Sequence, residues 1–111
     1  MSLDDEIYSE IGQLLYNSAP DDAKLIVMDA ELSNEGDSCR FNYDYINTKG
    51  EKNWFLPEQG LTDQRLRELL VMLRTFFMEN FKSKEKPFWH GCVATLDVEK
   101  SEISIDFKYE K

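Results

Sequence analysis

The amino-acid sequence predicts an α+β fold, in which two helices cover one face of an antiparallel sheet of four to five strands. Three observations predict it. Apolar residues recur at helical spacing in two segments, apolar and polar residues alternate in several short segments, and turn residues separate the strand-like segments. The expected order is α-β-β-β-α-β-β. A chain of 111 residues can bury one ordinary core, so we expect a single domain over residues 1–111.

The first segment, residues 3–16, has the pattern of an amphipathic helix. Its apolar side chains recur at helical spacing, at Leu3, Ile7, Ile11, Leu14 and Leu15. Carboxylates at residues 4–6 lie in the first turn, where they offset the helix dipole. The polar residues that precede Pro20, together with Pro20 itself, end this helix.

Two strands are predicted next, over residues 24–32 and 38–46. In each of them every second residue is apolar, at Ile26, Met28, Ala30 and Leu32, and then at Cys39, Phe41, Tyr43 and Tyr45. Turn-forming residues fill positions 33–37, so the two strands should pair as an antiparallel hairpin. A short third strand around residues 52–56 carries Trp54 and stops at Pro57. We expect it at the sheet edge, where it could pair with a partner or another copy.

The second helix is predicted to begin with Thr62 as its N-cap and Asp63 in its first turn. Its apolar stripe places it across the centre of the core, with Leu66, Leu69, Leu70, Leu73, Phe77 and Phe81. Lys82, Lys84 and Lys86 cluster near its C-terminus. Two further strands, at residues 92–98 and 102–109, are joined by a turn at residues 99–101 and form a second hairpin.

The charge of the chain excludes several classes of partner. Asp and Glu total 22 against 13 Lys and Arg, which gives a formal net charge of −9. Such a chain repels phosphate backbones and anionic membranes, so we expect no direct nucleic-acid or membrane binding. No signal peptide and no membrane-length apolar run are present. The sequence therefore indicates a cytoplasmic protein with reduced thiols.

The sequence offers little material for an active site. Its two cysteines, Cys39 and Cys92, are far apart, and His90 is the only histidine, so we expect no metal and no cofactor. A nucleophilic pair would need a cysteine beside His90. Cys39 has the phase of core residues, and His90 follows an aromatic residue at a strand entry. There is no glycine-rich phosphate loop. We therefore predict no catalytic residues and no enzyme.

The residues that alternate with the apolar set are rich in carboxylates. The strand phases place them on the sheet face opposite the helices, at Asp29, Glu31, Asp44, Asp97, Asp106 and Glu110. A plain solvated face explains this pattern, and so does a surface that receives a basic protein. Trp54 and Trp89 lie at strand ends, where they either anchor a partner or cover the ends of the core.

Nearly the whole chain resembles the YezG-like family of antitoxin and immunity proteins. The resemblance rests on DDEIYSEIGQLLYNSAP, on the aromatic strand CRFNYDYINTKGE, on LTDQRLRELLVMLRTFFMENF, and on the final hairpin that ends in DFKYE. It implies an immunity domain that binds and neutralises a cognate toxin, commonly a nuclease, with contact-dependent growth inhibition as one setting. It carries no set of binding residues, and it leaves the toxin and the oligomeric state open.

A second hypothesis comes from a different class of protein. The chain could be a small-molecule-binding or regulatory domain that uses aromatic side chains of its sheet. That reading requires a pocket lined by Trp54, by Trp89, or by Tyr43 and Tyr45.

Overall fold

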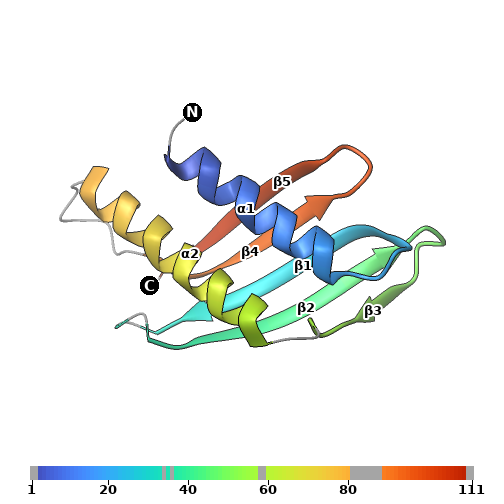
Figure 1. The fold of residues 1–111 in the computed structure, drawn as a ribbon, viewed down its shortest axis with the longest axis horizontal. Helices are drawn as coiled ribbons and strands as arrows, with labels where there is room; N and C mark the ends of the chain where they lie inside the picture. The colour runs from blue at the N-terminus through green and yellow to red at the C-terminus, as the bar shows by residue number, and fades with distance from the viewer. Residues whose placement is uncertain (1–2, 34, 36, 58–59, 81–88, 110–111) are drawn as a thin grey trace.

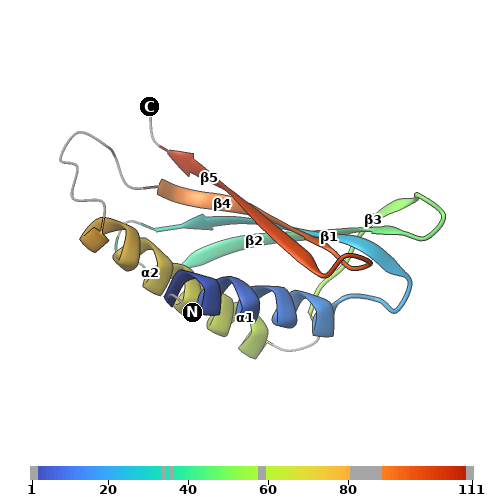
Figure 2. The same cartoon turned by 90° about the horizontal axis from the view of Figure 1, so that it is seen from above.

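The computed structural model describes residues 3–33, 35, 37–57, 60–80 and 89–109, which form two layers (Figure 1). One layer is a five-stranded antiparallel sheet with the strand order β3-β2-β1-β4-β5. Its strands are β1 (Ala23–Leu32), β2 (Cys39–Asn47), β3 (Lys52–Trp54), β4 (Trp89–Asp97) and β5 (Glu102–Tyr109). The second layer holds α1 (Leu3–Ser18) and α2 (Gly60–Asn80), which both lie on the same face of the sheet (Figure 2). The predicted fold class and element order are confirmed.

Three predicted boundaries need correction. The fourth strand covers Trp89–Asp97 and not residues 92–98, so Trp89 is part of the strand itself. The third strand ends at Trp54 and not near Leu56, and among the described residues only one further backbone hydrogen bond continues its pairing with β2. The backbone N–H of Phe55 donates to the carbonyl of Tyr43, and its ring is only 8% exposed. The second helix begins at Gly60, so Thr62 lies inside its first turn and is not the N-cap. The predicted lysines at positions 82, 84 and 86 lie outside the described residues.

The core forms between the helices and the inner face of the sheet. α1 contributes Ile7, Ile11 and Leu15, and α2 contributes Leu66, Leu69, Leu70 and Leu73, all nearly inaccessible to solvent. Spacings of three and four residues place these side chains along one stripe of each helix. The strands meet them with every second residue, as their alternation predicts. In β1, for example, Ile26, Met28 and Ala30 are 1%, 0% and 0% exposed.

Two polar contacts fix α2 relative to its neighbours. Arg65 forms a fork with Glu10 of α1, with Nε–Oε2 and Nη2–Oε1 distances of 2.5 and 2.9 Å. The hydroxyl of Tyr43 on β2 donates to Asp63 in the first turn of α2, over 2.5 Å. Burial, and then the Asp63 carboxylate, raise the pKa of Tyr43. These contacts hold the helix in register with the sheet at both of its packing surfaces.

Aromatic rings close the two ends of the core. Trp89 packs between Phe77 of α2 and Phe107 of β5, with ring centroids 6.4 and 4.9 Å away. At the other end, Phe55 contacts the rings of Tyr43 and Tyr45 at 5.6 and 5.9 Å. Edge and tilted arrangements at these distances are favourable between aromatic side chains. Trp89 therefore belongs to the core.

Candidate partner-binding surface

One face of the sheet points away from both helices, and no described helix covers it; we call it the open face (Figure 2). Strand alternation and the observed register define the side chains on it. β1 contributes Leu25, Val27, Asp29 and Glu31; β2, Arg40, Asn42, Asp44 and Ile46; β3, Lys52 and Trp54; β4, Val93, Thr95 and Asp97; and β5, Glu102, Ser104, Asp106 and Lys108. It is the largest surface of the sheet that is available to a partner.

The predicted acidic residues share the open face, but they do not form one continuous patch. Asp29, Glu31, Asp44, Asp97 and Asp106 all lie on it by register, and Glu110 lies outside the described residues. Cations interrupt them at one end of the strands. Arg40 lies opposite Glu31, and Lys108 bonds to Asp29 with an Nζ–Oδ1 distance of 2.5 Å.

Gly91 makes the contact between Lys108 and Asp29 feasible. Lys108 on β5 lies opposite Gly91 on β4, which in turn lies opposite Glu31 on β1. Because Gly91 has no side chain, the lysine can reach over β4 to the carboxylate on the next strand. The backbones are also close here: a Cβ at Gly91 would lie 2.4 Å from the carbonyl oxygen of Ala30. The local geometry requires glycine.

Apolar side chains cross the three central strands of the open face diagonally, from the Leu25–Ile46 row at one end of the ladders to Val93. Leu25 lies opposite Ile46, and Val27 is diagonal to both Ile46 and Val93. All four are half-buried although no helix covers them. We call these four residues the apolar stripe. Strand alternation alone predicts polar residues on this face and does not predict the stripe. The signal is nevertheless present in the sequence, because residues 25–28 are all apolar and therefore supply both faces of the strand.

Carboxylates lie beside this stripe. Asp44 lies opposite Val27, Asp97 lies opposite Leu25, and Asp106 lies opposite Val93. Asp97 also accepts a hydrogen bond from the backbone N–H of Lys100, over 3.1 Å. Among the described residues, carboxylates outnumber cations on the open face: Asp29, Glu31, Asp44, Asp97, Glu102 and Asp106 against Arg40, Lys52 and Lys108. Apolar area bordered by charged side chains is common on protein-binding surfaces.

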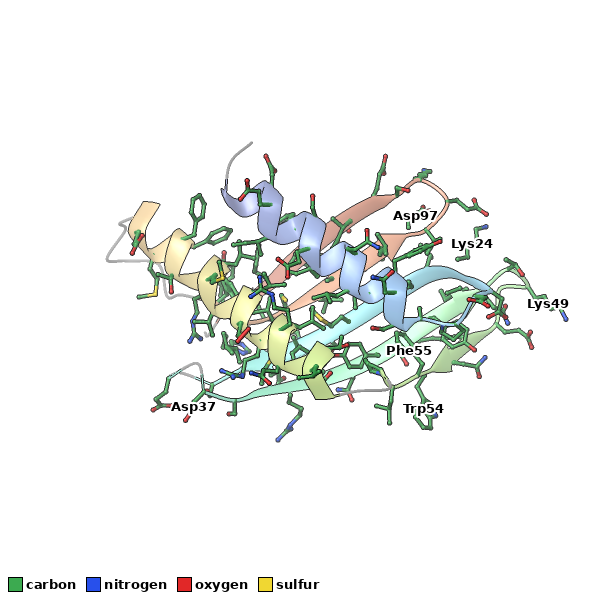
Figure 3. The ribbon with its side chains drawn as sticks, viewed as in Figure 1. Lys24, Asp37, Lys49, Trp54, Phe55 and Asp97 are labelled. Carbon is green, nitrogen blue, oxygen red and sulfur yellow. The ribbon has the colours of Figure 1, made fainter. Side chains whose placement is uncertain are left out.

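The two tryptophans have opposite environments. Trp54 lies on β3 opposite Asp44, is 72% exposed, and sits at the outer margin of the sheet, whereas the neighbouring Phe55 turns inward (Figure 3). Trp89 is 1% exposed. In the described part of the chain its indole Nε1 has no hydrogen-bond partner. Trp89 therefore cannot touch a partner in this conformation, and only Trp54 remains available as an aromatic anchor.

The cysteines are not in a state suited to nucleophilic chemistry. Cys92 is fully buried, and burial raises the pKa of its thiol to about 12. Burial also raises the pKa of Cys39 to about 11, although the nearby guanidinium of Arg67 opposes this shift. A nucleophilic cysteine needs the thiolate at neutral pH, and these shifts have the opposite direction. Nor do the described residues hold any group of three His, Cys, Asp or Glu arranged to bind a metal.

A cavity of about 570 Å³ lies where β1 and β2 meet their connecting turn. Its lining includes Glu31, Cys39, Arg40 and His90. The aromatic residues that the small-molecule hypothesis requires do not line it, because Trp89 and Tyr43 are buried in the core and Trp54 lies on the sheet margin. Cys39 and His90 both line this cavity, and the raised pKa of the Cys39 thiol disfavours its thiolate form.

Comparison with known proteins assigns a family. A family model described as "Immunity protein YezG-like" matches residues 4–111, which includes every helix and strand except the first residue of α1. No curated protein matches the chain significantly. Across the described residues, neither helix combines the length and the apolar character needed to cross a membrane.

Proposed function

The chain belongs to the YezG-like immunity protein family, and from this premise we propose that it neutralises a cognate toxin by binding it directly. Family membership supports an immunity or antitoxin role. Binding accounts for such a role without catalysis, in keeping with the protonated thiols and the lack of a metal-binding cluster among the described residues. We further propose that the protein acts in the cytoplasm, where an incoming toxin would meet its target.

We propose that the toxin is a nuclease with a basic active cleft. A nuclease must hold a polyanion, so its cleft carries lysine and arginine side chains. A protein with a net charge of −9 is attracted to such a cleft over long range, and the attraction speeds the encounter. Occupation of the cleft would exclude the nucleic-acid substrate. Contact-dependent growth inhibition is one setting in which such a toxin is delivered.

The observation that carries the choice of surface is the apolar stripe beside carboxylates on the open face. The half-buried residues of the apolar stripe supply the area that a partner can desolvate, and the carboxylates supply the charge that selects a basic partner. Trp54 at the margin adds an exposed aromatic ring of the type that often dominates binding energy. The proposed contact residues are Asp29, Glu31, Asp44, Asp97, Asp106, Glu110 and Trp54.

Co-purification tests the function, and charge reversal tests the surface. The product of the adjacent gene should co-purify with this protein and lose its nuclease activity on stoichiometric addition. A neighbouring product that degrades neither DNA nor RNA would remove the nuclease proposal. Co-purification without inhibition would remove the immunity mechanism.

The surface test compares two triple variants with the same change in net charge. Asp29→Lys, Glu31→Lys and Asp44→Lys alter the open face, whereas Glu6→Lys, Asp21→Lys and Glu79→Lys alter exposed positions elsewhere. We expect the first set to weaken toxin binding about a hundredfold or more and to flatten the dependence of the association rate on ionic strength. The control set should lower the association rate only modestly. Equal affinities for the two variants would move the interface away from the open face.

A further inference from the structure

β5 is an outer strand whose second edge is unoccupied. In the sheet order β3-β2-β1-β4-β5 it pairs only with β4, and no described strand lies on its other side (Figure 1). Every second residue of β5 therefore turns its backbone N–H and C=O outward without a strand partner, and such an edge can accept another strand. The opposite edge is divided, because β3 covers only Lys52–Trp54 and pairs with Asp44–Ile46, which leaves the first part of β2 as the edge beside it.

The core is also incomplete along β5. Its inward-facing residues Ile103, Ile105 and Phe107 remain partly exposed, whereas the equivalent rows of β1 and β4 are almost fully buried. Cys92 and Ala94, the partners of Phe107 and Ile105 on β4, are both 0% exposed. A strand added beside β5 would therefore cover apolar surface in addition to satisfying backbone groups.

We propose that β5 pairs antiparallel with β5 of a second copy of this chain, about a twofold axis at Ile105. The two sheets would then join into one, with both helix layers on the same side. Pairs would form between residues whose numbers sum to 210, so Ile105 faces Ile105 and Ile103 faces Phe107 of the second copy. In each pair, both residue numbers are odd or both are even. Because alternate residues of β5 direct their backbone N–H and C=O away from β4, residues with free backbone groups on one copy face residues with free backbone groups on the other.

The charges on β5 are self-complementary in this register. On the open face, Glu102 would lie opposite Lys108 of the second copy, and symmetry creates this pair twice. Ser104 would lie opposite Asp106. A shift of two residues one way brings Asp106 against Asp106, and a shift the other way brings Glu102 against Asp106. Like charges directly opposite each other disfavour pairing, so both shifts are opposed.

The contact with Asp29 does not prevent the new pair. Lys108 already donates to Asp29 within one protomer. An ammonium group has three donors, so Lys108 can serve both carboxylates. Charged residues on an outer strand usually guard against pairing. The charges on β5 would prevent self-pairing only if like charges lay opposite each other, whereas in this register opposite charges do.

This inference does not depend on the identity of the toxin. Strand addition uses the backbone edge and leaves the open face free, so each protomer of a dimer keeps its proposed toxin-binding surface. The self-complementary charge pattern is the reason to name a second copy as the occupant and not a strand of the toxin. A strand pair alone buries less than the roughly 1,200 Å² of ordinary stable interfaces, so the dimer should dissociate on dilution.

Sedimentation equilibrium of the purified full chain over a range of concentrations tests the proposal. The wild-type protein should be a monomer–dimer mixture. Glu102→Lys and Lys108→Glu should each weaken self-association about tenfold or more, because each places two like-charge pairs in the interface. The double variant restores opposite charges and should recover the wild-type dissociation constant, an effect that a fold defect would not produce.

The matched control is the swap Glu99→Lys with Lys100→Glu in the exposed turn of the same hairpin, outside the paired segment. It should leave self-association unchanged. Circular dichroism checks folding, and Glu102→Lys keeps the test valid if Lys108→Glu unfolds through loss of its contact with Asp29. A wild-type chain that stays monomeric at all concentrations overturns the proposal, as does a double variant without recovery. A chain that is monomeric alone and pairs along β5 only with toxin also overturns it.

Discussion

The replacement Gly91→Ala should destabilise the protein although it adds a single methyl group. The new Cβ would lie 2.4 Å from the carbonyl oxygen of Ala30, and real Cβ contacts essentially never fall below 3.0 Å. The backbone must therefore open by at least the difference, 3.0 − 2.4 = 0.6 Å, between the two inner strands β1 and β4 at the Glu31–Gly91 end of their ladder. Since the obstructing atom belongs to paired backbone, no side-chain rotation can relieve the contact.

Overpacking of this kind costs about 1–3 kcal/mol of unfolding free energy. For a domain of this size, that corresponds to a melting temperature roughly 4–13 °C lower. Urea denaturation followed by circular dichroism measures the loss directly, as a lower midpoint with an unchanged slope.

The matched control is Gly12→Ala in the middle of α1. The nearest atoms to a Cβ at Gly12 are side-chain carbons of Ile103 and Leu96 at 3.7 and 3.8 Å, which is ordinary contact. Alanine is the better helix former, so this variant should gain about 0.5–1 kcal/mol. If Gly91→Ala unfolds at the wild-type midpoint, the sheet takes up the methyl group without cost and the steric argument is wrong.

Three further predictions concern titration, thiol reactivity and binding. The pKa of Tyr43 is raised in the folded state by burial and by Asp63. The stabilising contribution of Tyr43 should therefore be fully present below the ordinary tyrosine pKa of about 10 and fall as pH rises above it, and the stability of Tyr43→Phe should fall less steeply. Equal slopes in alkaline denaturation of both proteins would contradict this. Cys92 should resist alkylation at neutral pH until the chain unfolds, and Cys39 should react more slowly than a free thiol, as mass spectrometry can follow. Trp54→Ala should change stability by less than about 0.5 kcal/mol but weaken toxin binding roughly tenfold or more, measured by calorimetry; unchanged affinity would exclude the ring as an anchor.

The elements of this fold are predictable where local pattern and tertiary burial agree. β5 matches its predicted bounds, because Ile103, Ile105 and Phe107 alternate without interruption with charged and small polar residues. The end of β3 is not predictable in this way. Nothing in its local sequence reveals that the strand ends at Trp54 while the ring of Phe55 packs against Tyr43 and Tyr45.

The sequence predicts which residues lie on the open face, but it does not predict which of them are neighbours there. Alternation alone assigns Asp29 and Lys108 to the same side of the sheet, but 79 residues separate them, and only the strand order brings them together. The role of Trp89 could not be predicted from its local sequence either. A tryptophan at a strand entry fits both an anchor and a core residue, and the position of Phe77 on a distant helix decides between them.

The central position of β1 has a kinetic consequence. Its pairing with β2 is a local hairpin, whereas its pairing with β4 joins segments as far apart as Leu25 and Asp97. The two hairpins can each close within microseconds, but the β1–β4 ladder must first bring distant parts of the chain together. Its formation should therefore limit the folding rate, as non-local strand pairing does in other mixed domains. A newly synthesised molecule would therefore become able to bind its partner only after the β1–β4 ladder has formed.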